Sequence, residues 1–381
     1  MRVFPSFLDP ITRRRILRLT DQGNNVHLYF TENAFVRGRP EIIFRSDRAS
    51  GKKCFPHENP HYNLFRLNYQ TGEITQLTDE DEPVGSTTKT PDGRYIAYLC
   101  GRQLRLLDTQ TGETRTLYED TGQFKLYSPS ISPNLRYVGF VRNERVQTEN
   151  TNVNYGGFKE NYYQIKDGRV TLARIDGSEW FDVHRDTCWL GHFQFAPHDP
   201  SLAMFCHEGP WHLVTQRIWL LDLASRRVHP LFRQEEQDSV GHEFWTQDGL
   251  IFFDNRGPNH DGTITRERTQ ATVHPPEASA FQPYLGFLDV EGRLLQRYSM
   301  PYYCNHYHAN PDHTLLVGDE ADRLVLIDLR QDPPQLEVLA YHGTSWYTQA
   351  SHCHPTFCWD GRHILYASDA GGQVNLYLLE L

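Results

Sequence analysis

The chain of 381 residues has a formal net charge of −10, and 13% of its residues are aromatic. The acidic balance argues against a general nucleic-acid binder, and no apolar run reaches the roughly 18 residues of a membrane span, so neither partner is expected. The N-terminus lacks the apolar core and cleavage site of a signal peptide, and the seven cysteines show no paired spacing, which favours reduced thiols in the cytoplasm.

A two-part pattern recurs along the chain. Its first half is a short strand, a turn and a strand rich in β-branched and aromatic residues, as in residues 89–98, 130–140 and 357–366. Its second half is a strand, a Thr-Gly-Glu type of turn and a final strand, as in residues 64–78 and 104–117. The Asp-Gly and Thr-Gly pairs suit hairpin turns because glycine accepts a positive φ. Four strands in a unit of roughly 45–60 residues indicate a propeller blade.

Counting the first halves gives seven blades, which start near Val26, Val84, Ser128, His192, His242, His306 and His354. The seventh blade reaches the end of the chain without a final strand. Residues 16–20 resemble residues 74–78, so we expect the N-terminal segment to complete the seventh blade and leave no open edge. The prediction is an all-β, seven-bladed β-propeller that forms one domain over residues 1–381, with its last blade closed by the N-terminal strand.

Two stretches interrupt the repeats. Residues 143–168 are polar and rich in Asn and Tyr, and residues 255–282 are rich in Gly, Arg and Pro. We expect both to be long loops on a face of the propeller, where functional residues often lie.

Three of the predicted blades place a histidine six residues before the aspartate of a turn, in the pairs His242 and Asp248, His306 and Asp312, and His354 and Asp360. These positions begin the strand that lines a propeller's channel, so the three histidines are expected at one mouth of it. His352 shares a strand face with His354, and Gln349 precedes both. Three imidazoles and an amide oxygen favour Mn, Fe, Co, Ni or Zn over Ca or Mg. The alternatives are a general base or simple packing at the blade starts.

The fourth repeat holds a second group of candidates. His207 and Glu208 are adjacent, so they point to opposite faces of a strand. Arg217 begins an apolar run and needs a carboxylate partner, either from a ligand or internally from Glu208 or Asp222. Aromatic side chains suit a carbohydrate site as well as core packing. The candidate substrate-binding residues are His192, His207, Trp211 and Trp346.

Six motifs follow one another in the second half of the chain: Trp-Leu-Gly-His-Phe-Gln-Phe-Ala-Pro (189–197), Phe-Cys-His-Glu-Gly-Pro-Trp (205–211), Arg-Ile-Trp (217–219), His-Glu-Phe-Trp (242–245), Thr-Ser-Trp (344–346) and Gln-x-x-His-x-His-Pro (349–355). Through them the chain resembles the oligogalacturonate lyases, the seven-bladed propellers of polysaccharide lyase family 22. The resemblance runs from about residue 9 to the C-terminus and is dense from Trp189 onward.

The resemblance implies a cytoplasmic enzyme that cleaves short oligogalacturonides by metal-assisted β-elimination. Its divalent cation, usually Mn²⁺, would be held by His306, Gln349, His352 and His354. His242 would be the base, and Arg217 would meet the uronate carboxylate. Metal and arginine on the carboxylate would stabilise an enolate-like transition state while a neutral imidazole removes the weakly acidic C5 proton.

The sequence also departs from the family pattern. His308 stands two residues after His306, so either could bind the metal, and the spacing to Asp312 favours His306. Segments 47–57 and 255–282 are not matched to the family, which leaves the exact sugar open. The alternatives are a lyase for a different acidic glycan and a non-catalytic TolB-like propeller that only binds. A prolyl peptidase propeller is disfavoured because the sequence holds no hydrolase domain with a Gly-x-Ser-x-Gly elbow.

Overall fold

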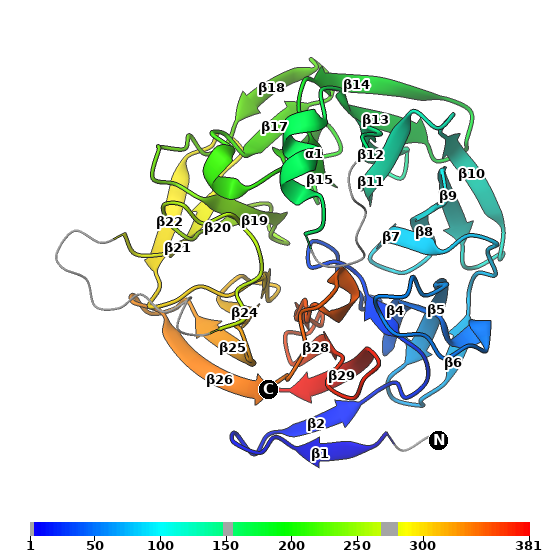
Figure 1. The fold of residues 1–381 in the computed structure, drawn as a ribbon, viewed down its shortest axis with the longest axis vertical. Coiled ribbons are helices and arrows are strands. Elements are labelled where there is room, and N and C mark those ends of the chain that lie inside the picture. The colour runs from blue at the N-terminus through cyan, green and yellow to red at the C-terminus, as the bar shows by residue number, and fades with distance from the viewer. Residues whose placement is uncertain (1–3, 148–154, 268–280) are drawn as a thin grey trace.

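The strands form seven sheets arranged around a central axis (Figure 1). They are seen in a computed structural model that describes residues 4–147, 155–267 and 281–381. Six sheets have four antiparallel strands and one has five. The architecture is the all-β, seven-bladed β-propeller that the repeats predict.

Each blade contributes one strand nearest the axis and three more toward the rim. The inner strands are β3 (Asn25–His27), β7 (Val84–Lys89), β11 (Phe124–Ile131), β15 (Leu190–Phe195), β19 (Val240–Trp245), β23 (Tyr307–Ala309) and β27 (Thr356–Phe357). The second strands are β4 (Glu41–Ser46), β8 (Tyr95–Cys100), β12 (Tyr137–Glu144), β16 (Leu202–His207), β20 (Ile251–Asn255), β24 (Leu315–Asp319) and β28 (His363–Ser368). All seven predicted blade starts therefore lie within or just before an inner strand.

The third strands are β5 (Asn63–Asn68), β9 (Gln103–Asp108), β13 (Gly168–Arg174), β17 (Ile218–Asp222), β21 (Tyr284–Leu288), β25 (Arg323–Asp328) and β29 (Asn375–Glu380). The rim strands are β6 (Ile74–Gln76), β10 (Thr114–Glu119), β14 (Trp180–Asp186), β18 (Arg227–Pro230), β22 (Leu294–Ser299), β26 (Gln335–Tyr341) and β2 (Arg15–Arg18). The predicted turn glycines join these strands with a positive φ, as at Gly72 (77°), Gly93 (70°) and Gly361 (71°).

The ring is closed by the N-terminal segment, as predicted. Strand β2 pairs with β29 of the last blade, with Ile16 opposite Leu379. An additional strand, β1 (Ser6–Leu8), pairs with β2 on the outside and makes this sheet five-stranded. The sequence analysis did not predict β1, whose residues are all exposed and therefore lack an alternating pattern.

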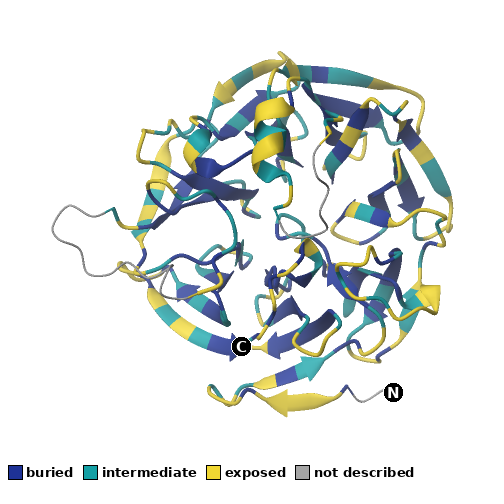
Figure 2. Cartoon of the chain, viewed as in Figure 1, coloured by how far each residue is buried: buried dark blue, intermediate teal, exposed yellow. Residues whose placement is uncertain are grey.

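The core lies between neighbouring blades. One cluster joins Phe252 and Phe287 of the fifth blade to Leu316 and Ile327 of the sixth, and all four side chains are buried. Burial of each such side chain stabilises the fold by about 1.5–3 kcal/mol. Figure 2 shows the result, because buried residues fill the inner strands while exposed residues collect on the rim strands and connecting loops.

The two interruptions of the repeats lie between second and third strands. The first contains a short helix, α1 (Phe158–Gln164), where only a loop was expected, and its residues 148–154 lie outside the described part. The second spans β20 to β21, and its residues 268–280 also lie outside that part. Three short 3-10 helices complete the description: η1 (Arg48–Ser50), η2 (Trp211–Leu213) and η3 (Gln349–Ser351). Among the described residues, no helix is long and apolar enough to cross a membrane.

The closing strand generates a stability prediction. Ile16 is fully buried between β29 and the last blade's core, whereas Ile11 is 65% exposed in the turn between β1 and β2. We expect Ile16→Ala to lower the free energy of unfolding by about 2–5 kcal/mol, because it leaves a cavity. The matched control Ile11→Ala should change it by less than about 0.5 kcal/mol. Urea denaturation measures both, and equal effects would mean that β2 does not close the ring.

Candidate functional site

The inner strands carry an irregularity that turns selected side chains toward the axis. The strand register shifts between Gly191 and Gln194 in β15 and between Gly241 and Phe244 in β19. A β-bulge of this kind re-aims the side chain that it displaces. His192 (φ 46°) and His242 (φ 50°) occupy the bulges, and His354 (φ 43°) has the same backbone conformation just before β27.

Three buried histidines meet at this end of the channel. Ring nitrogens of His306, His352 and His354 all lie within 4.8 Å of one another. The Nε2 atom of His354 is buried and has no hydrogen-bond partner among the described residues. A buried, convergent set of imidazole nitrogens is the donor set of a divalent transition metal. The residues present therefore fit a metal ion.

Gln349, the fourth predicted ligand, lies beside this cluster. It begins the 3-10 helix η3, which a reciprocal capping box between Thr348 and Ser351 holds in place. The Gln349 side chain is exposed and lines the cavities that reach His354 and His306. All four predicted ligands thus come to one mouth of the channel, with the three imidazoles in contact and the amide at the cavity wall.

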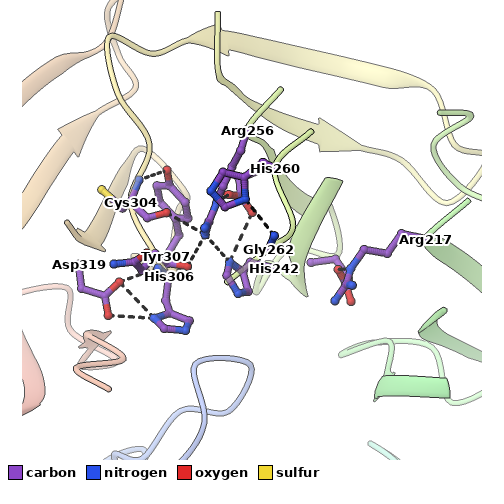
Figure 3. A network of polar contacts seen from close by, with 12 residues as sticks. Arg217, His242, Arg256, His260, Gly262, Cys304, His306, Tyr307 and Asp319 are labelled. Carbon is purple, nitrogen blue, oxygen red and sulfur yellow. Dashed lines mark hydrogen bonds and ion pairs between the residues drawn. The ribbon is translucent and has the colours of Figure 1, made fainter. Parts of the chain in front are cut away.

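A buried carboxylate orients the cluster. The Nδ1 atom of His306 lies 3.0 Å from Oδ2 of Asp319 (Figure 3). The backbone N–H of His354 donates to the same oxygen at 3.2 Å. A carboxylate on one ring nitrogen fixes the tautomer and leaves Nε2 free for a metal. Burial raises the pKa of Asp319 to about 8. Sequence reasoning missed Asp319, which ends β24 in the pattern Leu-Leu-Val-Gly-Asp.

The structure separates His306 from His308. The Nδ1 atom of His308 accepts a hydrogen bond from the backbone N–H of Phe357 at 3.2 Å, and its ring stacks on Phe244. His308 is not part of the His306–His352–His354 cluster. The geometry agrees with the spacing argument that favours His306.

His242 stands next to the cluster but belongs to a different set of contacts. Its ring centroid is 4.8 Å from that of His306. Its Nδ1 atom lies 3.0 Å from Nη2 of Arg256 and 3.6 Å from Oδ1 of Asp254 (Figure 3). Burial, together with the nearby His306 and Arg256, holds the pKa of His242 well below its usual range. The imidazole is therefore in its neutral form.

Arg217 sits in a buried network of carboxylates. Its Nε donates to Glu243 at 2.9 Å and its Nη1 donates to Glu208 at 3.1 Å. Glu243 also lies 2.8 Å from Nδ1 of His192. Burial alone would raise the pKa of Glu243, but Arg217 and His192 together hold it below its usual value. The internal ion pair is therefore present, with Glu208 and Glu243 as partners, while Asp222 instead accepts turn N–H groups.

Both candidate tryptophans contact histidines of the site, but only Trp211 lines one of the two cavities described next, and Trp346, predicted to bind substrate, lines neither. Trp211 packs edge-on to His242, with ring centroids 4.9 Å apart, and lies under the guanidinium groups of Arg217 and Arg256. A Cβ atom at Gly241 would come within 2.0 Å of the Trp211 ring, so glycine is required there. Trp346 is buried beside His352 at 5.5 Å. His207, by contrast, faces away: its Nε2 atom is 3.2 Å from Asp186, and it lines neither cavity described next.

Two adjoining cavities open over these residues. The larger has a volume of about 530 Å³ and the smaller about 260 Å³. They share the lining residues Tyr29, Tyr127, Trp189, His192, Glu208 and Gln349. Phe30 closes the channel beneath them, because its ring contacts those of His192, His242, His306 and His354. The sequence analysis missed Phe30, whose only signal is an aromatic pair directly after the first inner strand.

Fold and site together define a seven-bladed β-propeller with a histidine cluster fit for a divalent metal at one end of its channel. The chain belongs to the oligogalacturonate lyase family, a family of enzymes whose family model matches residues 2–256. It is 25% identical to the oligogalacturonide lyase of Pectobacterium atrosepticum and 26% identical to the oligogalacturonate lyase of Dickeya dadantii. Each alignment covers 99% of this chain and 96% of the relative. A solved oligogalacturonate lyase in complex with manganese, 24% identical, has the same fold, with a TM-score of 0.82 over 100% of this chain and 96% of that one.

The geometry predicts which histidine binds metal. We expect His306→Ala to weaken the binding of a divalent transition metal by more than about 100-fold, since loss of a ligand should exceed the 10–100-fold loss typical of a ligand's hydrogen-bond partner. His308→Ala, two residues away, should leave the affinity unchanged within about threefold. Calorimetric titration of the metal-free protein measures both. A larger loss in His308→Ala than in His306→Ala would reverse the assignment.

Proposed function

We propose that the protein is a metal-dependent lyase that cleaves short oligogalacturonides, the breakdown products of pectin, by β-elimination. The observation that carries this proposal is the His306–His352–His354 cluster with His242 beside it, in a chain of the oligogalacturonate lyase family. The cavity of about 530 Å³ supports it, because pockets of about 300–1,000 Å³ are usual for small ligands.

Manganese is the proposed metal. The donor set of three imidazoles and one amide oxygen suits Mn²⁺, and a solved relative is an oligogalacturonate lyase in complex with manganese. His306, His352, His354 and Gln349 would hold it. When bound, the ion would supply a positive charge that polarises the uronate carboxylate. Asp319 would keep the His306 ring in its ligating orientation.

His242 is the proposed base, a role that requires a hydrogen on Nδ1 and a lone pair on Nε2. The Nη2 atom of Arg256 has two hydrogens but three acceptors nearby: the carbonyls of Cys304 (3.0 Å) and Asn305 (2.6 Å) and Nδ1 of His242 (3.0 Å). When both hydrogens go to the carbonyls, Nδ1 of His242 can carry its own hydrogen. Oδ1 of Asp254, which lies 3.6 Å from Nδ1 and has no hydrogen-bond partner among the described residues, is an acceptor beside it. In that tautomer Nε2 carries the lone pair that accepts the proton.

The proposed reaction needs two proton transfers and the cleavage of one C–O bond. Nε2 of His242 takes the C5 proton, the C5–H electron pair forms the C4–C5 double bond, and the C4–O bond breaks toward the leaving sugar. The leaving oxygen takes a proton from solvent water, and the imidazolium of His242 returns its proton to solvent. Arg217 lines the smaller cavity and would donate to the uronate carboxylate, while Glu208 and Glu243 fix its orientation. His192 and Trp211 would shape the cavity walls rather than react, and Trp346 would support the ring of His352 from behind.

The cytoplasm is the proposed location. All seven cysteines are free thiols, which suits a reducing compartment. The proposed partner is a small oligouronide, with neither nucleic acid nor a membrane involved. A different acidic glycan is the second substrate candidate, because the residues named above recognise a uronate carboxylate rather than a particular sugar ring.

The test is formation of an unsaturated product. With Mn²⁺ present, oligogalacturonate should give a rising ultraviolet absorbance from the conjugated double bond, and removal of metal by a chelator should stop it. We expect His242→Ala to lower kcat by at least about 10²-fold while metal content stays unchanged, since general-base catalysis contributes 10²–10⁴-fold. His207→Ala, in the neighbouring blade and outside the cavities, is the matched control and should retain activity.

Three outcomes would contradict the proposal at different points. A folded, metal-loaded protein that gives no product from oligogalacturonate but does so from another uronide would replace the substrate. Absence of stoichiometric metal together with absence of product would favour a TolB-like binding module. Retention of most activity by His242→Ala would assign the base elsewhere.

A further inference from the structure

The cations around the cavities differ in how their charge is balanced. Arg217 and Arg256 are buried; Arg217 pairs with Glu208 and Glu243, and Arg256 pairs with Asp254 at 2.9 Å. These acidic neighbours outweigh burial and raise the pKa of both guanidinium groups. Arg45 differs, because it is half-buried and its removal from solvent lowers its pKa.

Arg45 lacks a carboxylate partner among the described residues. It comes from β4 of the first blade and lines the larger cavity. Its Nη1 reaches the backbone carbonyl of Val84 at 3.4 Å, and its guanidinium lies 5.5 Å from the ring of Tyr62. A half-buried cation without a counter-ion has lost part of its hydration, and an anionic group of a ligand in the cavity would replace it.

Tyr62 provides a second, independent observation at the same wall. Its hydroxyl is buried, and it makes no hydrogen bond within the part of the chain that the structure describes. Tyr62 lines the larger cavity together with Arg45. A cation without a carboxylate partner and a hydroxyl without a hydrogen-bond partner, among the described residues, therefore line the same cavity. A carboxylate, with two oxygens and several lone pairs, is the ligand group that satisfies both.

The position of this pair relative to the histidine cluster sets its role. The cavity that contains Arg45 and Tyr62 also reaches His354 and Gln349. Its remaining wall includes Ser86, Thr87 and Ser128 of the next two blades, whose hydroxyl groups suit a sugar. A saccharide unit held here is therefore the neighbour of a unit held at the cluster.

We propose that Arg45 and Tyr62 form a second carboxylate subsite, which binds the uronate unit whose anomeric oxygen leaves in the elimination. The inference rests on the proposed function for the identity of the sugar. Arg45 and Arg217 then have distinct roles. Arg217 binds the carboxylate of the unit that loses its C5 proton, and Arg45 binds the carboxylate of the other unit. The site then selects a de-esterified oligouronide over one that is neutral at this position.

The test pairs a protein change with a substrate change. Binding to the Mn²⁺-loaded protein is measured by calorimetry for a digalacturonate and for the same disaccharide with its leaving unit methyl-esterified, both in the His242→Ala background so that neither is cleaved. The acid form should bind roughly 10- to 100-fold more tightly, as expected for a charge-assisted pair. Arg45→Met should reduce this ratio to about threefold or less by weakening only the acid form.

The control removes an equal charge from the same blade. Arg66 on β5 lies 3.9 Å from Glu41 and lines neither cavity. Arg66→Met should keep the full preference for the acid form. If Arg45→Met weakens both disaccharides equally, Arg45 only supports the fold and the subsite is refuted. The subsite is also refuted if the unsubstituted Arg45 protein shows no preference between the two ligands.

Two further arms keep the result interpretable. If Arg45→Met does not fold, as judged by thermal unfolding, Arg45→Lys takes its place, because lysine keeps the positive charge but lacks the paired N–H donors of the guanidinium. Arg45→Lys should retain part of the preference for the acid form. An equal loss of affinity for both disaccharides overturns the proposal. Because the readout is binding, it is independent of turnover. A protein that discriminates the two disaccharides through Arg45 but forms no unsaturated product would refute the lyase assignment and leave the subsite standing.

Discussion

Pairing of β2 with β29 is the constraint on which the position of every site residue depends. The histidines of the site come from the fourth, fifth, sixth and seventh blades and meet only because the seven sheets share one axis. That axis exists once the N-terminal strand completes the last blade, with Ile16 buried against Leu379. A chain end that is remote in sequence from the site is thus required for its geometry.

Within the closed ring, the site contains two kinds of polar group, neutral imidazoles and charged guanidinium groups. The imidazoles of the cluster are buried, which lowers their pKa and keeps them neutral, so their nitrogens are available to a metal. The cations beside them are mostly fixed by acidic partners, as Arg217 is by Glu208 and Glu243. Such pairs offset part of their desolvation cost internally and keep donors preorganised toward the cavity. Arg45 departs from this arrangement, which is why it points to a ligand rather than to the fold.

Sequence reasoning predicted the blades and brought His306, His352 and His354 to one place, but it did not predict the residues that hold them there. Turn chemistry such as Asp92-Gly93 marks the hairpins because it depends only on local residues, and the six-residue spacing found His306 and His354 for the same reason. Asp319 and Phe30 were not predicted as site residues, because their roles depend on which strand ends become neighbours after the ring has closed. His207 was grouped with the site by its place in a motif, yet strand alternation turns it away while Glu208 faces inward.

The left-handed backbone at the bulges has a consequence for how this protein can change. His192, His242 and His354 hold φ values between 43° and 50°, a conformation that costs a side chain on the order of 1–3 kcal/mol and glycine almost nothing. Stability therefore favours glycine at these three positions, whereas the chemistry of the channel requires histidine. Glycine at any of these positions would relieve the backbone strain but would remove an imidazole from the channel, so the strain and the chemistry of the channel are retained together.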